Sequence, residues 1–259
     1  MVNLLSVGVL LVIDCTGSME IIHKYLSSSL SSIVSKFQDE GVPVQFSAIG
    51  FRDYKAKPET AFELINFDGD INSLESWLSG VKAEGGGSNY GESSMSAIVH
   101  GIELVSWPDV KRKVVALFTD DGPHVPDYKV ESWLDAREKL ASNNIEQIHL
   151  FTVNRKVEKY DQLDGHDYVV IRHTLAENDL DEMDVDNLEQ SIRDFVKVSS
   201  SGNFGSSEII ARDDGQFESN PFDIDDFDTV TSTPLESSSK EAESADLDED
   251  LDGDFFDMD

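Results

Sequence analysis

Two uninterrupted hydrophobic runs, at residues 7–13 and 114–118, stand out in the pattern of the chain. Runs that are apolar at nearly every position are typical of central strands buried on both faces of a parallel sheet. Apolar positions three and four residues apart follow the first run between residues 22 and 37 and predict an amphipathic helix there. Weaker strand patterns occur at residues 42–51, 61–67, 148–153 and 168–171.

Helical patterns separate these strands, so that strands and helices alternate along the chain. They fall at residues 70–81, 95–105, 128–141 and 186–198. Such alternation predicts an α/β fold with a doubly wound, mostly parallel central sheet flanked by helices and joined by right-handed crossovers. A polar loop joins the strands at 42–51 and 61–67, which favours one antiparallel strand at an edge of the sheet.

The composition of the chain changes near residue 200. Residues 201–259 contain 19 acidic and two basic residues, whereas residues 1–200 contain 33 acidic and 18 basic residues. A segment this acidic cannot bury enough apolar surface to offset its ordering entropy. We therefore expect a folded domain at residues 1–200 and a largely disordered acidic tail at 201–259. The net charge of −32 argues against direct binding to nucleic acid or to an anionic membrane.

The single cysteine, Cys15, excludes an intramolecular disulfide and fits a reducing compartment. We expect its side chain to pack as a small apolar residue. The apolar N-terminus lacks the basic residues and the small-residue cleavage site of a secretory signal. No apolar run reaches the ~18 residues of a membrane span. These features predict a cytoplasmic protein that does not enter a membrane.

Oxygen-bearing side chains follow both buried strands, at the edge where open α/β sheets bind ligands. Asp14, Thr16 and Ser18 come after the first run, and Asp120 comes after the second. The glycine-rich loop at residues 84–92 adds a further hydroxyl. Hard oxygen donors suit Mg²⁺, and also Ca²⁺ or Mn²⁺, better than zinc or copper. The sequence therefore predicts a divalent-cation site that leaves coordination positions open for an acidic side chain of a partner.

The string at residues 14–19, Asp-Cys-Thr-Gly-Ser-Met, resembles the metal-ion-dependent adhesion site of von Willebrand factor A (vWA) domains. It is similar to a variant common in intracellular and prokaryotic members, and the similarity covers roughly residues 1–200. The resemblance implies a Rossmann-like vWA fold, with Ser88 and Asp120 joining the metal ligands of the first motif. It also implies a metal-dependent protein-interaction module, which we expect to act as a scaffold or regulatory subunit of an intracellular complex.

Two departures from the family pattern leave the ligand set open. Ser88 stands where the family usually has threonine, so Asn89 is an alternative to it. Asp121 follows Asp120 where the family often has glycine, so either carboxylate is a candidate.

The pair Arg52-Asp53 resembles one that follows the second strand in a subset of the family, and we expect it to support the ligands from behind. His124 lies next to the predicted site in the sequence, where a position on a surface loop is the simpler interpretation.

An alternative hypothesis is a magnesium-dependent phosphotransferase or phosphatase of the haloacid-dehalogenase type, with Asp14 as nucleophile. That family normally places a second aspartate two residues later as general acid. Thr16 occupies this position, and its hydroxyl cannot serve as an acid near neutral pH. We therefore predict that the protein is not an enzyme.

The tail contains two clusters that combine acidic and aromatic residues. Phe222 and Phe227 belong to the first, and Phe255 and Phe256 to the second. Such clusters are typical of linear motifs that fold on docking into a basic, apolar-lined groove of a partner. The alternatives are a merely solubilising extension and a mimic of nucleic acid that competes for a basic cleft. We expect protein partners both at the metal site and at the tail.

Overall fold

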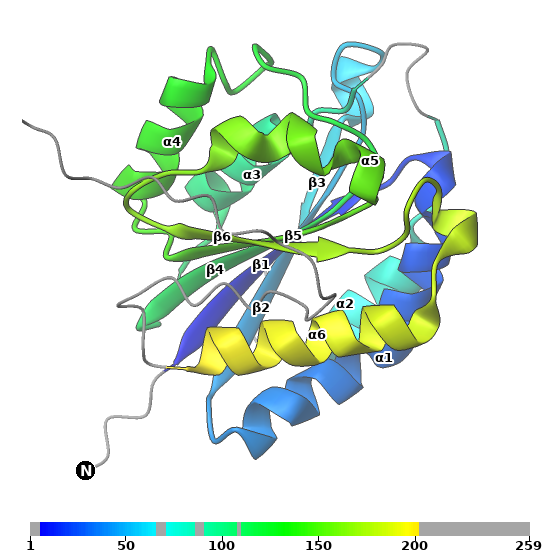
Figure 1. Ribbon diagram of the computed structural model, residues 1–259, viewed down its shortest axis with the longest axis vertical. Coiled ribbons are helices and arrows are strands. Elements are labelled where there is room, and N and C mark those ends of the chain that lie inside the picture. Colours follow the sequence, from blue (N-terminus) through cyan, green and yellow to red (C-terminus); the bar gives the residue numbers. More distant parts are fainter. Residues whose placement is uncertain (1–5, 66–70, 86–90, 108–109, 202–259) are drawn as a thin grey trace, which may run out of the picture. The chain divides into compact units, whose positions relative to one another are not determined.

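The computed structural model describes residues 6–65, 71–85, 91–107 and 110–201, which form a six-stranded sheet between two layers of helices (Figure 1). The strands are β1 (Val7–Asp14), β2 (Val44–Phe51), β3 (Phe62–Ile65), β4 (Arg112–Phe118), β5 (Gln147–Thr152) and β6 (Val169–Thr174). Their order is β3-β2-β1-β4-β5-β6, and all neighbours are parallel except β2 and β3. The predicted fold class, including the antiparallel edge strand, is confirmed.

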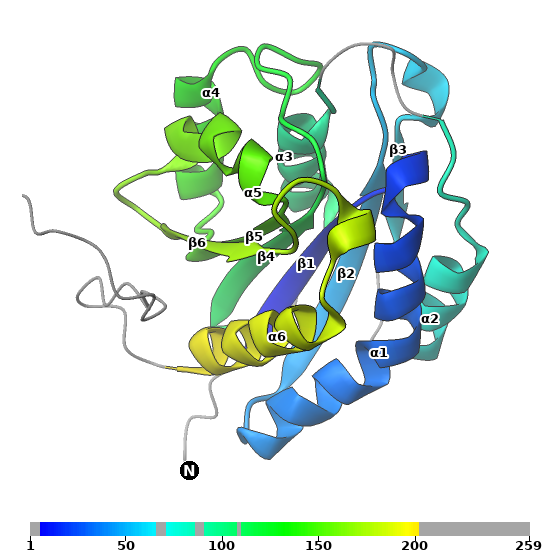
Figure 2. The ribbon, with the colours of Figure 1, turned by 45° about the vertical axis from the view of Figure 1, so that its right-hand side comes forward.

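Helices cover both faces of the sheet (Figure 2). They are α1 (Glu20–Asp39), α2 (Ile71–Gly80), α3 (Ser94–Leu104), α4 (Trp133–Ser142), α5 (Asn154–Val157) and α6 (Val185–Ser200). The helices α1, α2 and α6 share one hydrophobic core with the sheet, and α3 and α4 share the other. No helix of the described ranges has the length and apolarity needed to cross a bilayer.

β1 is the central strand that the hydrophobic pattern predicts, and every one of its residues is buried. Its side chains alternate between the two cores: Val9 and Leu11 pack toward α1 and α6, whereas Leu10 and Val12 pack toward α3. The strand therefore needs apolar residues at consecutive positions, and the polar Asp14 appears only where the strand ends.

The predicted helix at 128–141 is wrong in its first turn, because α4 begins only at Trp133. Ser132 caps this helix by accepting a hydrogen bond from the amide of Asp135 at 3.1 Å. Val130 is completely buried and fits the helical spacing, but it belongs to a turn in which it pairs with Asp127. A second difference follows β5, where α5 and a 3₁₀ helix at Glu158–Leu163 occupy a stretch with no predicted element.

A group of buried polar side chains joins β5 and β6 to α6. Nδ1 of His149 lies 2.9 Å from Nε2 of His173, and its own Nε2 lies 3.2 Å from Oε1 of Gln147 and 3.3 Å from Oγ of Ser199. Phe195 of α6 packs edge-on against the His149 ring. Burial, together with the neighbouring His173, lowers the pKa of His149 well below its ordinary value. The ring therefore stays neutral in the folded protein.

We expect His149 to make the fold less stable as the pH falls below about 6.5, because the unfolded chain then binds a proton at this residue and the folded chain does not. As the pH falls, the His149 imidazole lowers the free energy of unfolding by up to about 1.4 kcal/mol per pH unit, until the pKa of His149 in the folded protein is reached. Arg112, which donates to the Ser199 carbonyl oxygen at 3.1 Å, remains protonated throughout. Urea unfolding between about pH 7 and pH 5 should give a shallower pH dependence for His149→Gln; equal slopes would contradict the assignment.

Candidate functional site

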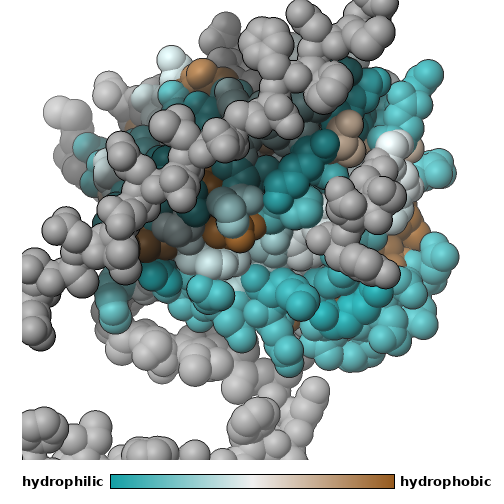
Figure 3. All heavy atoms as spheres, turned by 90° about the horizontal axis from the view of Figure 1, so that it is seen from above, coloured by the Kyte–Doolittle hydropathy of each residue, from teal (hydrophilic) through white to brown (hydrophobic). Residues whose placement is uncertain are grey.

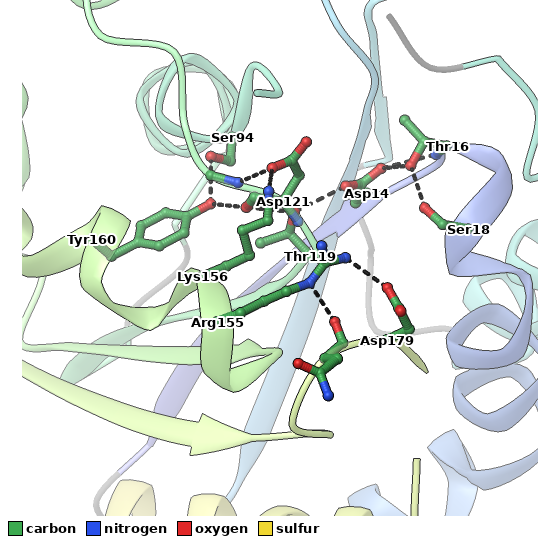
Figure 4. Close-up of polar contacts among 12 residues, drawn as sticks. Asp14, Thr16, Ser18, Ser94, Thr119, Asp121, Arg155, Lys156, Tyr160 and Asp179 are labelled. Carbon is green, nitrogen blue, oxygen red and sulfur yellow. Dashed lines mark hydrogen bonds and ion pairs between the residues drawn. The ribbon is translucent and has the colours of Figure 1, made fainter. Parts of the chain in front are cut away.

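Asp14 ends β1 with a completely buried side chain at the carboxyl edge of the sheet. Its Oδ1 accepts hydrogen bonds from the amide and the hydroxyl of Thr16, at 2.9 and 2.7 Å (Figure 4). Its Oδ2 accepts one from the hydroxyl of Thr119, at 2.9 Å. Burial raises the pKa of Asp14 to about 7, against the opposing effect of these hydrogen bonds. The carboxylate is thus held in a fixed orientation by neutral donors, and no basic side chain pairs with it among the described residues.

The turn after β1 brings two hydroxyls to Asp14. Oγ of Ser18 lies 3.4 Å from Oγ1 of Thr16, and Ser18 is exposed at the start of the turn that leads into α1. The amide of Gly17 donates to the carbonyl oxygen of Gly85 at 3.2 Å, which joins this turn to the beginning of the glycine-rich loop. The three residues of the first motif are therefore neighbours at one edge of the sheet.

Cys15 packs under this turn as predicted. Its thiol is buried, and a Cβ added at Gly50 of β2 would lie 2.8 Å from its sulfur. Burial raises the pKa of the thiol to about 12, so the group is unreactive at neutral pH.

The two aspartates after β4 have different partners. Asp121 forms an ion pair with Lys156 and accepts a hydrogen bond from the amide of Gly122 at 2.7 Å. The carboxylate of Asp120 instead takes a hydrogen bond from the Ser18 side chain, while burial raises its pKa. Asp120 therefore belongs to the same group as Asp14 and the two hydroxyls, and Asp121 is already neutralised by a lysine.

Two basic side chains of α5 reach this edge of the sheet (Figure 4). Lys156 is the partner of Asp121, and Arg155 forms an ion pair with Asp179 at 2.6 Å. The positive charge of Arg155 also favours the ionised form of Asp120. Sequence reasoning missed both residues because α5 is too short and too polar to give a periodic signal.

Glu92 is a further carboxylate that sequence reasoning did not place at the site. It is 6% exposed, and its Oε2 has no hydrogen-bond partner in the described part of the chain. Its pKa is raised to about 9, chiefly by burial and in addition by the negative charges of Asp14, Asp53, Asp121 and Asp120. Glu92 therefore lies within electrostatic reach of every carboxylate of the site.

The position of Glu92 is fixed by the backbone. Its amide donates to the carbonyl oxygen of Gly122 at 2.8 Å, and its own carbonyl accepts from the amide of His124 at 2.9 Å. In the structure, residues 91–99, which include the first half of α3, are buried without interruption. Because α3 begins in the protein interior, the residues directly before it are buried as well, and Glu92 is one of them.

Arg52 and Asp53 directly follow β2 and belong to the surroundings of the candidate ligands. Arg52 donates to the carbonyl oxygens of Lys82 and Glu84, at 2.9 and 3.2 Å, and so holds the start of the glycine-rich loop. Asp53 is 1% exposed, and its Oδ2 has no hydrogen-bond partner among the described residues. His124 does not lie on an exposed surface loop: its side chain is only 11% exposed, and its Nε2 lies 3.5 Å from Oδ1 of Asp53.

Ser88 and Asn89, the alternative ligands from the glycine-rich loop, lie outside the described residues. The same holds for the four phenylalanines of the tail, Phe222, Phe227, Phe255 and Phe256. Their roles therefore stay predictions.

The described side chains fit a divalent cation that is bound mainly through hydroxyl and single carboxylate oxygens. Asp14 and Glu92 carry raised pKa values, and buried oxygens of Asp53 and Glu92 lack hydrogen-bond donors. A nearby cation stabilises the ionised form of such buried carboxyl groups. Within the described ranges, no three His, Cys, Asp or Glu side chains converge into a metal-binding group. A cation here would therefore depend on the Thr16 and Ser18 hydroxyls and on water, as is usual for Mg²⁺.

The described part of the chain is thus a doubly wound α/β domain with a carboxylate and hydroxyl cluster at the carboxyl edge of its sheet. No family model matches the chain, and no curated protein matches it. Solved structures do match, and at the identities found they show the fold alone.

The fold is similar to that of the pilus adhesin SpaC from Lactobacillus rhamnosus GG, with a TM-score of 0.53 and 13% identity over 76% of this chain and 31% of the adhesin. It is also similar to proximal thread matrix protein 1 from the mussel byssus, with a TM-score of 0.53 and 15% identity over 76% of this chain and 47% of that protein. The chain thus spans about a third of the first structure and about half of the second. The VWA domain of SpRpn10 aligns over 64% of this chain and 87% of its own length at 12% identity, with a TM-score of 0.44.

Proposed function

We propose that this domain is a metal-dependent protein-interaction module. A divalent cation, Mg²⁺ or else Ca²⁺ or Mn²⁺, would be held by Asp14, Thr16, Ser18 and Asp120, with Ser88 or Asn89 from the glycine-rich loop. A partner protein would complete the coordination with an aspartate or glutamate side chain. The observation that carries this proposal is the fully buried Asp14 carboxylate, oriented by Thr16 and Thr119 and left without a cationic partner among the described residues.

Two further observations support binding rather than catalysis. The similar structures are named as an adhesin and as a matrix protein. The face of the domain seen in Figure 3 is mostly hydrophilic where described residues are visible, with small separate hydrophobic patches. Such a surface suits a partner that is recognised largely through polar groups.

A phosphotransferase that uses Asp14 is not favoured. Both oxygens of this carboxylate already accept hydrogen bonds from threonine, and Thr16 stands where that chemistry needs an acid. We infer that the protein is not an enzyme and that it works in the cytoplasm as a scaffold or regulatory subunit. The acidic tail would be its second partner-binding element, through Phe222, Phe227, Phe255 and Phe256.

Affinity capture with the full chain separates the two binding elements. Asp14→Asn and the chelation of divalent cations should both release a partner held at the metal site, whereas alanine at the four tail phenylalanines should leave that partner bound. A partner lost only with the phenylalanines would place the interaction in the tail. The proposal fails if partner binding is unaffected by both Asp14→Asn and chelation.

A further inference from the structure

An aromatic cluster lies beside the site and has no role in holding a cation. It consists of Tyr54, Phe62, His100 and Tyr128, which we call the aromatic platform. The rings of Tyr54 and Tyr128 stack with centroids 4.4 Å apart and an interplanar angle of 18°, and Phe62 stacks on both at 6.1 and 5.9 Å. His100 of α3 supports Phe62 at 5.4 Å. Tyr128 remains 49% exposed, so the stack ends at the protein surface.

The platform is joined directly to the candidate metal site. Tyr54 follows the buried Asp53, and its amide donates to the hydroxyl of Ser93, the residue after Glu92, at 2.9 Å. Tyr128 belongs to the same loop as Asp120, which runs from the end of β4 to the start of α4. A segment bound at the site could therefore extend onto the platform.

Basic and acidic residues flank the two tyrosines of the platform: Asp53 and Lys55 stand beside Tyr54, and Asp127 and Lys129 beside Tyr128. Lys55 and Lys57 are exposed on the turn that follows Tyr54, and neither ammonium has a partner in the described part of the chain. Lys129 lies 5.5 Å from the centre of the Tyr128 ring, although it also pairs with Glu103 at 3.0 Å. The ammonium groups of Lys55 and Lys57 can pair with acidic side chains of a ligand, and the rings can stack on an aromatic one.

We propose that the aromatic platform binds a segment of a partner protein in which an aromatic side chain stands among acidic residues. This inference rests on the proposed function, because it extends the same site: one carboxylate of the segment completes the cation's coordination, the aromatic ring stacks on Tyr128, and neighbouring carboxylates face Lys55 and Lys57. Specificity for the partner then comes from the platform, since any acidic side chain can approach the cation.

The test uses the full chain with Mg²⁺ and a short synthetic peptide that carries one phenylalanine among aspartates and serines. Tyr128→Ala should weaken binding about five- to tenfold, and Tyr128→Phe should restore it because the ring is retained. The peptide with Phe→Ala should lose a similar factor with the natural chain and almost nothing with Tyr128→Ala. Leu134→Ala removes an exposed apolar side chain from α4 and serves as the control.

Replacing both Lys55 and Lys57 by serine should weaken binding and flatten its dependence on salt, whereas Lys197→Ser, on α6, should change neither. Asp14→Asn and chelation test the metal site separately. If they have no effect while Tyr128→Ala still weakens binding, the platform stands and the metal-dependent function fails. The platform proposal is overturned if Tyr128→Ala binds the peptide as the natural chain does, or if the loss is the same for both peptides.

Discussion

Asp14→Asn should abolish the stabilisation of the folded domain that we expect from Mg²⁺. A cation present at about 100 times its dissociation constant stabilises the state that binds it by about 2.7 kcal/mol, which raises the melting temperature of a domain of this size by roughly 5–10 °C. Asparagine keeps the shape of the side chain and one acceptor for Thr16, so the fold should persist. Without the carboxylate, we expect no shift in thermal melts recorded with and without Mg²⁺.

The matched control is Asp121→Asn, which removes a charge from the neighbouring loop. Because Asp121 pairs with Lys156 while Asp120 is hydrogen-bonded to Ser18, this variant should keep most of the Mg²⁺-induced shift, and Asp120→Asn should lose it. The opposite result would assign the metal-facing role to Asp121. A natural chain that shows no shift with Mg²⁺, Ca²⁺ or Mn²⁺ would contradict the metal site itself.

Phe151→Ala should produce the largest loss of stability among the substitutions considered, about 3–5 kcal/mol. Phe151 is completely buried on β5, where it stacks between Phe118 and His173 with ring centroids 4.3 Å from each. It also contacts Phe195 of α6 edge-on. Its removal leaves a cavity bordered by the rings of three elements, which cannot all move to fill it. Urea unfolding followed by circular dichroism measures the change.

Leu134→Ala is the comparison for this effect, because Leu134 is 58% exposed on α4. We expect its free energy of unfolding to stay within about 0.5 kcal/mol of the natural value. Similar losses for the two variants would mean that Phe151 does not occupy the buried position between β4 and α6.

The central part of the fold was predictable from local patterns, because β1 and β4 are buried on both faces and show this as unbroken apolar runs. The start of α4 was not. Val130 is buried for a tertiary reason, in a turn, and so extends the helical spacing backward beyond the Ser132 cap. Periodicity records which residues are buried, and it cannot tell a helical turn from another turn that points a residue at the core.

The candidate site was predictable only in part, for a related reason. Asp14, Thr16 and Ser18 stand at alternate positions of one short segment, so their spacing is enough to group them. Glu92 reaches the site because its backbone pairs with the Asp120 loop at Gly122 and His124, a contact between distant segments. Likewise, the ion pair of Lys156 with Asp121 is what sets this aspartate apart from Asp120. Lys156 belongs to α5, a helix that sequence patterns did not reveal.

Arg112 fixes the end of α6 to the sheet. Arg112, at the beginning of β4, donates to the carbonyl oxygens of Ser199 and Ser201, so the end of α6 is fixed at the amino edge of the sheet. Asp14 lies at the opposite edge, the length of an eight-residue strand away, which is about 26 Å. The proposed cation site and the end of α6 therefore lie at opposite edges of the sheet, with the full length of β1 between them. A partner bound at the proposed cation site would therefore contact the edge of the domain opposite Ser201.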